Sequence, residues 1–140
     1  RLLEDKTAAM IRGSLSNVSH LSQSILLRTL QSPAYWEERA ANAAILERRF
    51  RTAVAAALHP SCAHAFRVLP CNGGYFLCLE LSDGLHAEDV RRRLLAEHGI
   101  GVITVGDRLL RVAFSAIPEA DIPDVFRSIA QVCTSSPVPV

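Results

Sequence analysis

The chain has 140 residues, which suits one compact domain that buries about two thirds of the surface of its unfolded form. Its net charge is +1 and 21% of its residues are charged, which excludes a broad electrostatic field for nucleic acid or an anionic membrane. No apolar run approaches the roughly 20 residues that span a bilayer, and no secretory signal core is present. We therefore expect a cytoplasmic protein with reduced cysteines and with no nucleic-acid or membrane partner.

The N-terminal part predicts two helices. The segment from Arg1 to about Ile11 is charged and then apolar, like the end of a helix that began earlier, and the first residue is not methionine. We therefore expect the chain to be a piece of a longer protein. Gly13 to Asn17 supplies turn and capping residues. A short amphipathic helix follows, with apolar residues at helical spacing: Leu21, Ile25, Leu26 and Leu30.

A long helix is predicted next. Ser32 and Pro33 form a helix start, and the helical pattern runs to about Leu58 with many good helix formers and no glycine. Apolar residues recur every seven positions on one side of it: Trp36, Ala43, Phe50 and Ala57. We expect this stripe to pack against a sheet or another helix.

After His59 and Pro60 the apolar period changes to that of strands. Strands are predicted over Phe66 to Leu69 and Tyr75 to Leu81. A helix over Ala87 to His98 follows, ending at Gly99, with a predicted core face of Val90, Leu94 and Leu95.

The last elements are two more strands and a helix. The strands are predicted over Ile100 to Val105 and Leu109 to Phe114, and the helix begins at Pro118. The helix presents four core residues, Ile122, Val125, Phe126 and Ile129. The order predicts an α/β (α+β-like) small domain, with a long helix and further helices packed on one face of a three- or four-stranded sheet.

Arg111 lies in the middle of the apolar run Leu109 to Phe114. A buried charge without a partner is costly, so this side chain should reach an anion or a cleft. The alternative is that Arg111 lies on a solvated strand face or pairs with a nearby carboxylate. Lys6 is the only lysine among the 15 lysines and arginines, so any chemistry that needs a lysine of this chain depends on it.

Three other patterns give weaker indications. One loop contains four side chains of types that can bind metals: His59, Cys62, His64 and Cys71. Their spacing matches no zinc site and favours an ordinary loop. Asn72-Gly73-Gly74 feeds a strand, whereas a phosphate-binding loop feeds a helix. No G-x-S-x-G nucleophile motif is present, which argues against a hydrolase.

Near the N-terminus, Arg12 lies four residues before the pair Ser16-Asn17. This arginine has the chemistry to hold a carboxylate, and the pair has the chemistry to donate hydrogen bonds to a phosphate or a ring substituent. A helix cap beside a solvated arginine is the simpler interpretation of the same residues.

A series of motifs resembles the C-terminal third of the class I aminotransferases, the pyridoxal-phosphate enzymes of fold type I. The series runs from about Ile11 to about Cys133. It comprises Arg12-x-x-x-Ser16-Asn17, Glu47-Arg48-Arg49-Phe50-Arg51, Gly73-Gly74-Tyr75-Phe76, Glu97-His98-Gly99-Ile100 and Leu110-Arg111-Val112-Ala113-Phe114.

This resemblance implies roles for four residues. Arg111 matches the arginine that binds the substrate α-carboxylate. Arg12, with Ser16 and Asn17 near the cofactor, matches a segment that reaches the partner subunit's active site and can read an acidic side chain. The implied organisation is a connecting and inter-subunit segment (residues 1–17), a small domain (18–133) and a flexible tail (134–140).

The resemblance also implies what these residues do not supply. The lysine that bonds pyridoxal phosphate belongs to the family's large domain, and Lys6 has none of that motif's neighbours. We therefore expect a homodimeric enzyme that transfers an amino group between an amino acid and a 2-oxo acid, with this chain inactive alone and no metal site in it. Two alternatives remain: a free-standing α/β module that binds amino acids or acts as a regulator, and the small domain of a fold type I decarboxylase or synthase.

Overall fold

The computed structural model describes residues 1–15 and 19–135. The chain divides into two compact units, Arg1–Asn42 and Ala43–Val140. None of the described helices is long and apolar enough to cross a membrane.

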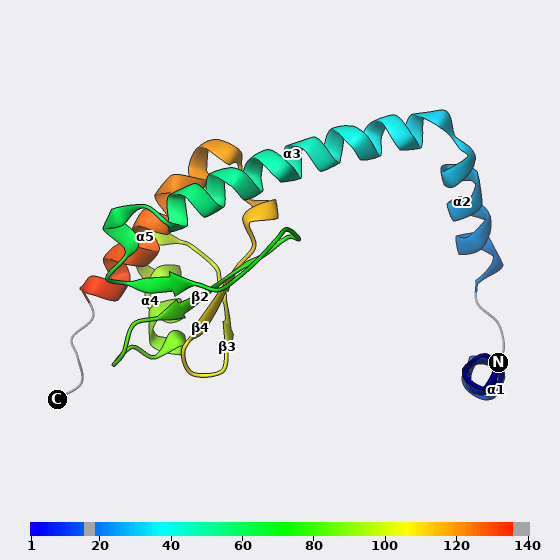
Figure 1. Cartoon of the computed structure of the whole chain (residues 1–140), viewed down its shortest axis with the longest axis horizontal. Coiled ribbons are helices and arrows are strands. Elements are labelled where there is room, and N and C mark those ends of the chain that lie inside the picture. The colour runs from blue at the N-terminus through cyan, green and yellow to red at the C-terminus, as the bar shows by residue number, and fades with distance from the viewer. Residues whose placement is uncertain (16–18, 136–140) are drawn as a thin grey trace. The chain divides into compact units, whose positions relative to one another are not determined.

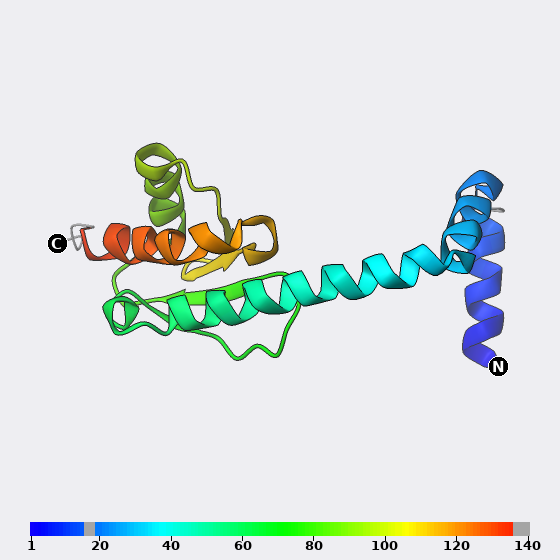
Figure 2. The ribbon, with the colours of Figure 1, turned by 90° about the horizontal axis from the view of Figure 1, so that it is seen from above.

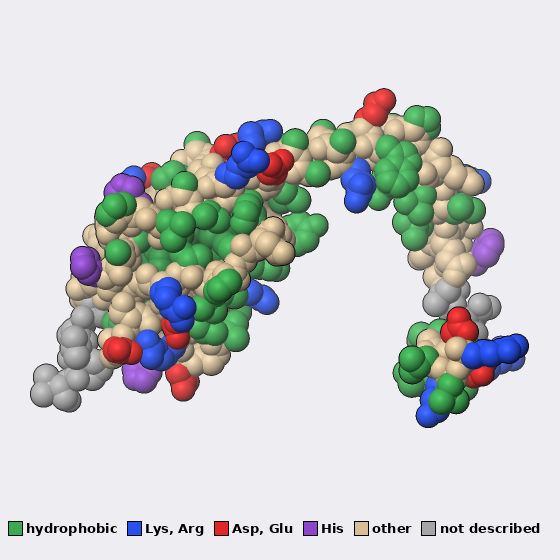
Figure 3. Space-filling model, in the orientation of Figure 1, with side chains coloured by type: hydrophobic (Ala, Val, Ile, Leu, Met, Phe, Trp, Pro, Cys, Tyr) green, Lys and Arg blue, Asp and Glu red, His purple; other side chains and the backbone are tan. Residues whose placement is uncertain are grey.

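The first unit contains α1 (Leu2–Ser14), α2 (His20–Gln31) and the beginning of α3 (Pro33–Ala57). Ser19 caps α2, because its side chain accepts a hydrogen bond from the backbone N–H of Ser22 at 3.4 Å. Neither α1 nor α2 has a buried residue. Figure 3 shows the resulting hydrophobic side chains along the surface of α2, where Leu21 is 70% exposed.

The predicted turn at Gly13 to Asn17 begins later than expected. Helix α1 continues through Gly13 to Ser14, because the Leu15 N–H still donates to Ile11 at 3.0 Å. The Ser14 hydroxyl also donates to the carbonyl of Met10 at 2.6 Å. Ser16 and Asn17, the pair singled out in the sequence, lie outside the described residues.

The second unit is built on a four-stranded sheet in the order β1-β2-β4-β3, with every neighbouring pair antiparallel. The strands are β1 (Phe66–Val68), β2 (Leu77–Leu81), β3 (Ile103–Val105) and β4 (Leu109–Val112). Three helical segments pack against the sheet (Figures 1 and 2). They are α4 (Ala87–His98), α5 (Ile122–Thr134) and the last part of α3. The described part of this unit also contains three short 3₁₀ helices: η1 (Pro60–Cys62), η2 (Phe114–Ala116) and η3 (Glu119–Asp121).

The core lies between these helices and one face of the sheet. Leu77, Leu79, Leu81, Leu110 and Val112 come from β2 and β4, and each is at most 1% exposed. The helices contribute Ala53, Val90, Leu94, Ile122, Phe126 and Ile129 to the same cluster. The predicted α/β small domain with helices on one face of a three- or four-stranded sheet is therefore confirmed.

Two predicted core positions are wrong. Leu95 is 53% exposed, because it follows the buried Leu94 and is turned about 100° away from it around α4. Trp36 is 54% exposed, so the apolar stripe of the long helix is buried only towards its C-terminal end, at Ala53 and Ala57. Thr134 ends α5, and residues 136–140 of the expected tail lie outside the described residues.

Candidate carboxylate-binding site

Arg111 lies on the face of the sheet opposite the helices. In β4 it alternates with the buried Leu110 and Val112, so its side chain leaves the sheet on the other side. We call this side the open face. Its residues are half-buried or exposed, and they are Arg67, Cys78, Glu80, Ile103, Val105, Leu109 and Arg111.

The cross-strand neighbours of Arg111 carry no charge. Cys78 of β2 and Ile103 of β3 pair with Arg111 in register, one on each side. No acidic side chain forms an ion pair with Arg111 anywhere in residues 1–15 and 19–135. The alternative in which Arg111 pairs with a nearby carboxylate is therefore wrong for this part of the chain.

The second arginine of the open face has a different environment. Arg67 of β1 forms an ion pair with Glu80 of β2, its partner in register, and its Nε donates to the same carboxylate at 3.0 Å. This pair neutralises both charges. Arg111 is thus the open-face cation that the described structure leaves without a counter-ion.

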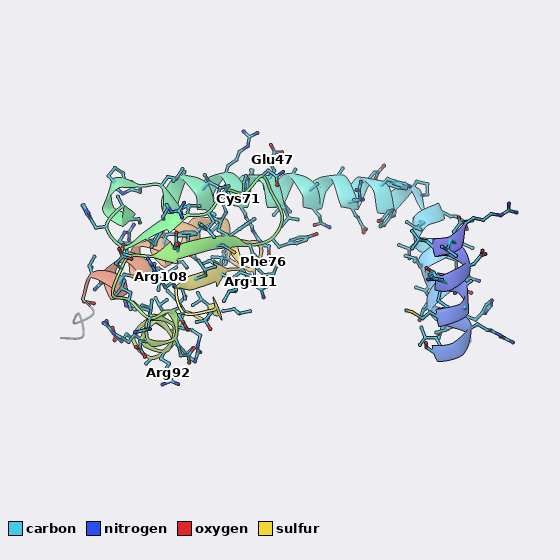
Figure 4. The ribbon with its side chains drawn as sticks, turned by 60° about the horizontal axis from the view of Figure 1, so that its bottom comes forward. Glu47, Cys71, Phe76, Arg92, Arg108 and Arg111 are labelled. Carbon is cyan, nitrogen blue, oxygen red and sulfur yellow. The ribbon has the colours of Figure 1, made fainter. Side chains whose placement is uncertain are left out.

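The guanidinium of Arg111 lies over an aromatic ring. Its Cζ lies 4.5 Å from the ring centroid of Phe76, which is a cation–π contact, and Figure 4 shows the two side chains next to each other. Its Nε atom is buried and has no hydrogen-bond partner in the described structure. An unsatisfied donor of this kind costs about 1–3 kcal/mol, so keeping Arg111 at this position lowers the stability of the fold.

The loop before β2 places Phe76. Gly73 (φ 148°) and Gly74 (φ 95°) adopt backbone conformations that favour glycine, so the chain turns there before entering the strand. The carbonyl of Tyr75 then accepts a hydrogen bond from the Ser115 N–H at 3.4 Å, which ties the loop to the turn after β4. The sequence motif Gly73-Gly74-Tyr75-Phe76 marked this loop, but it gave no indication that Phe76 contacts Arg111.

The turn after β4 is anchored by the long helix. The Arg49 side chain of α3 donates to the carbonyl of Ser115, and the ring of Phe50 lies 5.7 Å from that of the fully buried Phe114. These contacts fix the end of β4 to the core, and with it the strand that carries Arg111.

The second arginine predicted for the site, Arg12, lies in the last turn of α1, in the first unit. Arg111 belongs to the second unit, so the structure describes the two residues separately. The chain's single lysine, Lys6, is exposed in α1. Since residues 43–140 contain no lysine, the unit that carries Arg111 does not provide the amine that pyridoxal phosphate requires, and the residues around Arg111 do not fit a complete cofactor site.

The side chains of the segment that contains His59, Cys62 and Cys71 have ordinary structural positions. His59 caps η1 by accepting from the Ser61 N–H at 3.3 Å, Cys62 is buried in the core, and Cys71 is exposed. Within the described ranges no group of three or more histidine, cysteine, aspartate or glutamate side chains is close enough to hold a metal ion.

Comparison with known proteins identifies the fold. No family model matches the sequence, and no curated protein matches it. Among solved structures, an aminotransferase from Anaerococcus prevotii is similar over 96% of this chain, with a TM-score of 0.75 and 23% identity. An α-aminoadipate aminotransferase from Thermus thermophilus, solved with N-(5'-phosphopyridoxyl)-L-leucine, is similar over 94%, with a TM-score of 0.74 and 20% identity.

A third structure matches a smaller part of the chain. An aspartate transaminase from Corynebacterium glutamicum is similar over 66% of it, with a TM-score of 0.51 and 19% identity. This chain spans 32% of the length of the first of these proteins and 35% of the second, about a third of each. The chain therefore has the fold of a part of these aminotransferases.

Proposed function

We propose that this chain is the C-terminal domain of a pyridoxal-phosphate-dependent aminotransferase, in which Arg111 binds the α-carboxylate of the amino-acid substrate. The observation that carries the proposal is the guanidinium of Arg111 on the open face, in cation–π contact with Phe76 and without a counter-ion in the described structure. The shared fold with solved aminotransferases supports it.

Arg111 acts by binding and orientation. A planar guanidinium offers two parallel N–H donors to a carboxylate, and this fork fixes the direction of the bound group as well as its position. Holding the α-carboxylate in this way directs the α-amino group towards the cofactor. Pyridoxal phosphate, when bound, supplies the electron sink for amino transfer to a 2-oxo acid.

The rest of the proposed enzyme lies outside this chain. An upstream large domain provides the lysine and the cofactor site, and the chain alone is inactive. In the cytoplasmic homodimer, Arg12, with Ser16 and Asn17, extends towards the partner subunit's active site and reads an acidic substrate side chain. Residues 18–133 form the small domain in this arrangement.

The test uses the complete reading frame that contains this chain, purified with pyridoxal phosphate. We expect Arg111→Lys to raise the KM for the amino acid about tenfold or more, since a single ammonium cannot replace a bidentate fork. The cofactor absorbance should stay unchanged. The matched control is Arg67→Lys on the same face, whose charge already pairs with Glu80.

Either of two results would contradict the proposal. One is a reading frame without an upstream domain that binds the cofactor through a lysine. The other is an Arg111→Lys enzyme with the KM of the Arg67→Lys control.

A second candidate function is a free-standing module that binds an amino acid through Arg111 without a cofactor. The observation that favours it is the hydrophobic core that the described residues of the second unit form among themselves. Calorimetric titration of the 140-residue chain with amino acids separates the two candidates. Micromolar binding without cofactor would favour the module, whereas the proposed aminotransferase domain should bind amino acids only weakly on its own.

A further inference from the structure

Phe76 is an aromatic residue that lies outside the hydrophobic core. It is 42% exposed, although large aromatic side chains gain most by burial. Its ring contact in the structure is the guanidinium of Arg111, at 4.5 Å. The position of this ring is therefore explained by Arg111 and not by packing against the core.

We propose that Phe76 is a positioning residue, which holds the guanidinium of Arg111 in the orientation that accepts a carboxylate. The inference rests on the proposed function of Arg111. It adds a specific role for Phe76, which acts through Arg111 and does not itself bind the carboxylate.

The geometry of the two groups supports this role. A guanidinium is attracted to an aromatic ring through its flat face, whereas it donates hydrogen bonds in its own plane, from its edges. The Cζ of Arg111 lies 4.5 Å from the centroid of Phe76, and within the described residues the terminal nitrogens of Arg111 have no hydrogen-bond or ion-pair partner, so they can donate to a carboxylate. The contact with the ring also restricts the long side chain of Arg111 before any ligand binds. Less conformational entropy is then lost when a carboxylate binds.

The other neighbours of Arg111 cannot do the same. Cys78 and Ile103 flank it on the adjacent strands, but neither has a π-face or a charge that would orient a guanidinium. The hydrogen bond between Ser115 N–H and the Tyr75 carbonyl holds the backbone next to Phe76 against the end of β4. Phe76 is thus held close to the end of the strand that carries Arg111. Its ring can therefore orient the guanidinium of Arg111.

The test uses the 140-residue chain, with acetate as the probe and the Arg111 Nε–Hε signal observed by nuclear magnetic resonance. Phe76→Leu removes the ring and keeps an apolar side chain, and Phe76→Tyr keeps the ring. We expect Phe76→Leu to abolish the ring-current shift of the Arg111 Hε signal and to weaken acetate binding about two- to fivefold, the range of a cation–π contact. Phe76→Tyr should retain both properties.

Tyr75→Leu is the matched control, since Tyr75 is the exposed aromatic neighbour in the same loop. It should leave both readouts unchanged. Circular dichroism checks that each variant is folded, and Phe76→Met replaces Phe76→Leu under the same criteria if the leucine variant is unfolded.

The outcomes separate the inference from the proposed function. Acetate binding that Phe76→Leu does not alter, or that Tyr75→Leu weakens equally, would overturn the role of Phe76. Acetate binding that Arg111→Lys does not weaken, or the lack of any acetate response in the unsubstituted chain, would overturn the carboxylate role of Arg111. If Arg111→Lys weakens binding and Phe76→Leu does not, only the positioning role is lost.

Discussion

The guanidinium of Arg111, on the open face of the sheet, lies over the ring of Phe76, with 4.5 Å between Cζ and the ring centroid. This contact stabilises the charged group, but it leaves the buried Nε of Arg111 without a hydrogen-bond acceptor in the described structure. A residue that lowers the stability of its own fold is typical of a binding site.

Arg111→Leu should therefore stabilise the chain. Leucine removes the unsatisfied donor, which costs about 1–3 kcal/mol, and loses a cation–π contact of about 0.5–1 kcal/mol. We expect the free energy of unfolding in urea to rise by about 1 kcal/mol. Arg67→Leu, on the same face, breaks the ion pair with Glu80 and should give no such rise. A less stable Arg111→Leu chain would show that Arg111 supports the fold.

The sequence predicted the elements around the site better than their contacts. The helix ending at Gly99 was predicted with its bounds, since Gly99 adopts the left-handed conformation (φ 67°) that a glycine after a helix provides. The strand of Arg111 was also predicted, although β4 ends at Val112 and Phe114 begins a 3₁₀ turn. Local patterns were sufficient for these features because they depend on neighbouring residues.

The partners of Arg111 could not be predicted in the same way. Alternation along the strand puts Arg111 and Leu110 on opposite faces, but it does not say which strand lies beside β4 or in which register. The pairing of Arg111 with Cys78, and the approach of Phe76, depend on a contact between segments far apart in the sequence. For the same reason, the sequence could not predict that Arg111 has no acidic partner in the described structure. That prediction would require knowing which residues lie beside Arg111 on every neighbouring strand.

Phe114→Ala should destabilise the chain strongly. Phe114 is fully buried, contacts the ring of Phe50 and lies beside Ser115, whose carbonyl accepts from Arg49. Truncating a buried phenylalanine leaves a cavity and costs about 3–5 kcal/mol. We expect a loss of this size in urea unfolding. Ile45→Ala, at a position 37% exposed, should cost less than about 1 kcal/mol, and similar losses for both variants would argue against this core.

The four cysteines should differ in reactivity. Burial raises the pKa of the Cys133 thiol to about 11, so it stays protonated at neutral pH, and Cys62 is 2% exposed. Cys71 is exposed, which makes it the thiol we expect iodoacetamide to modify first at pH 8. Mass spectrometry of peptides from the folded chain measures each rate, and urea-unfolded protein gives the reference. Modification of Cys133 as fast as Cys71 would contradict the packing of α5.

Glu88 should make the stability of α4 depend on acid pH. The hydrogen bond from Arg91, with a further one from Arg92, lowers the pKa of Glu88 from 4.5 to about 2. The unfolded chain therefore takes up this proton at a higher pH than the folded chain does. Ionised Glu88 stabilises the fold above pH 4.5, and this contribution is lost as the pH falls from about 4.5 to about 2.

Substitution of Glu88 tests this dependence directly. Glu88→Gln should lower the midpoint of thermal unfolding at pH 7, and its difference from the unsubstituted chain should shrink as the pH is lowered from 4.5 to 2. Glu37→Gln, at an exposed position of α3, controls for the loss of one negative charge. If the difference in unfolding midpoint between Glu88→Gln and the unsubstituted chain stays constant over this pH range, the two arginines do not hold the carboxylate in its ionised form. The reason is that a group with the same pKa in the folded and unfolded chains produces no change in stability with pH.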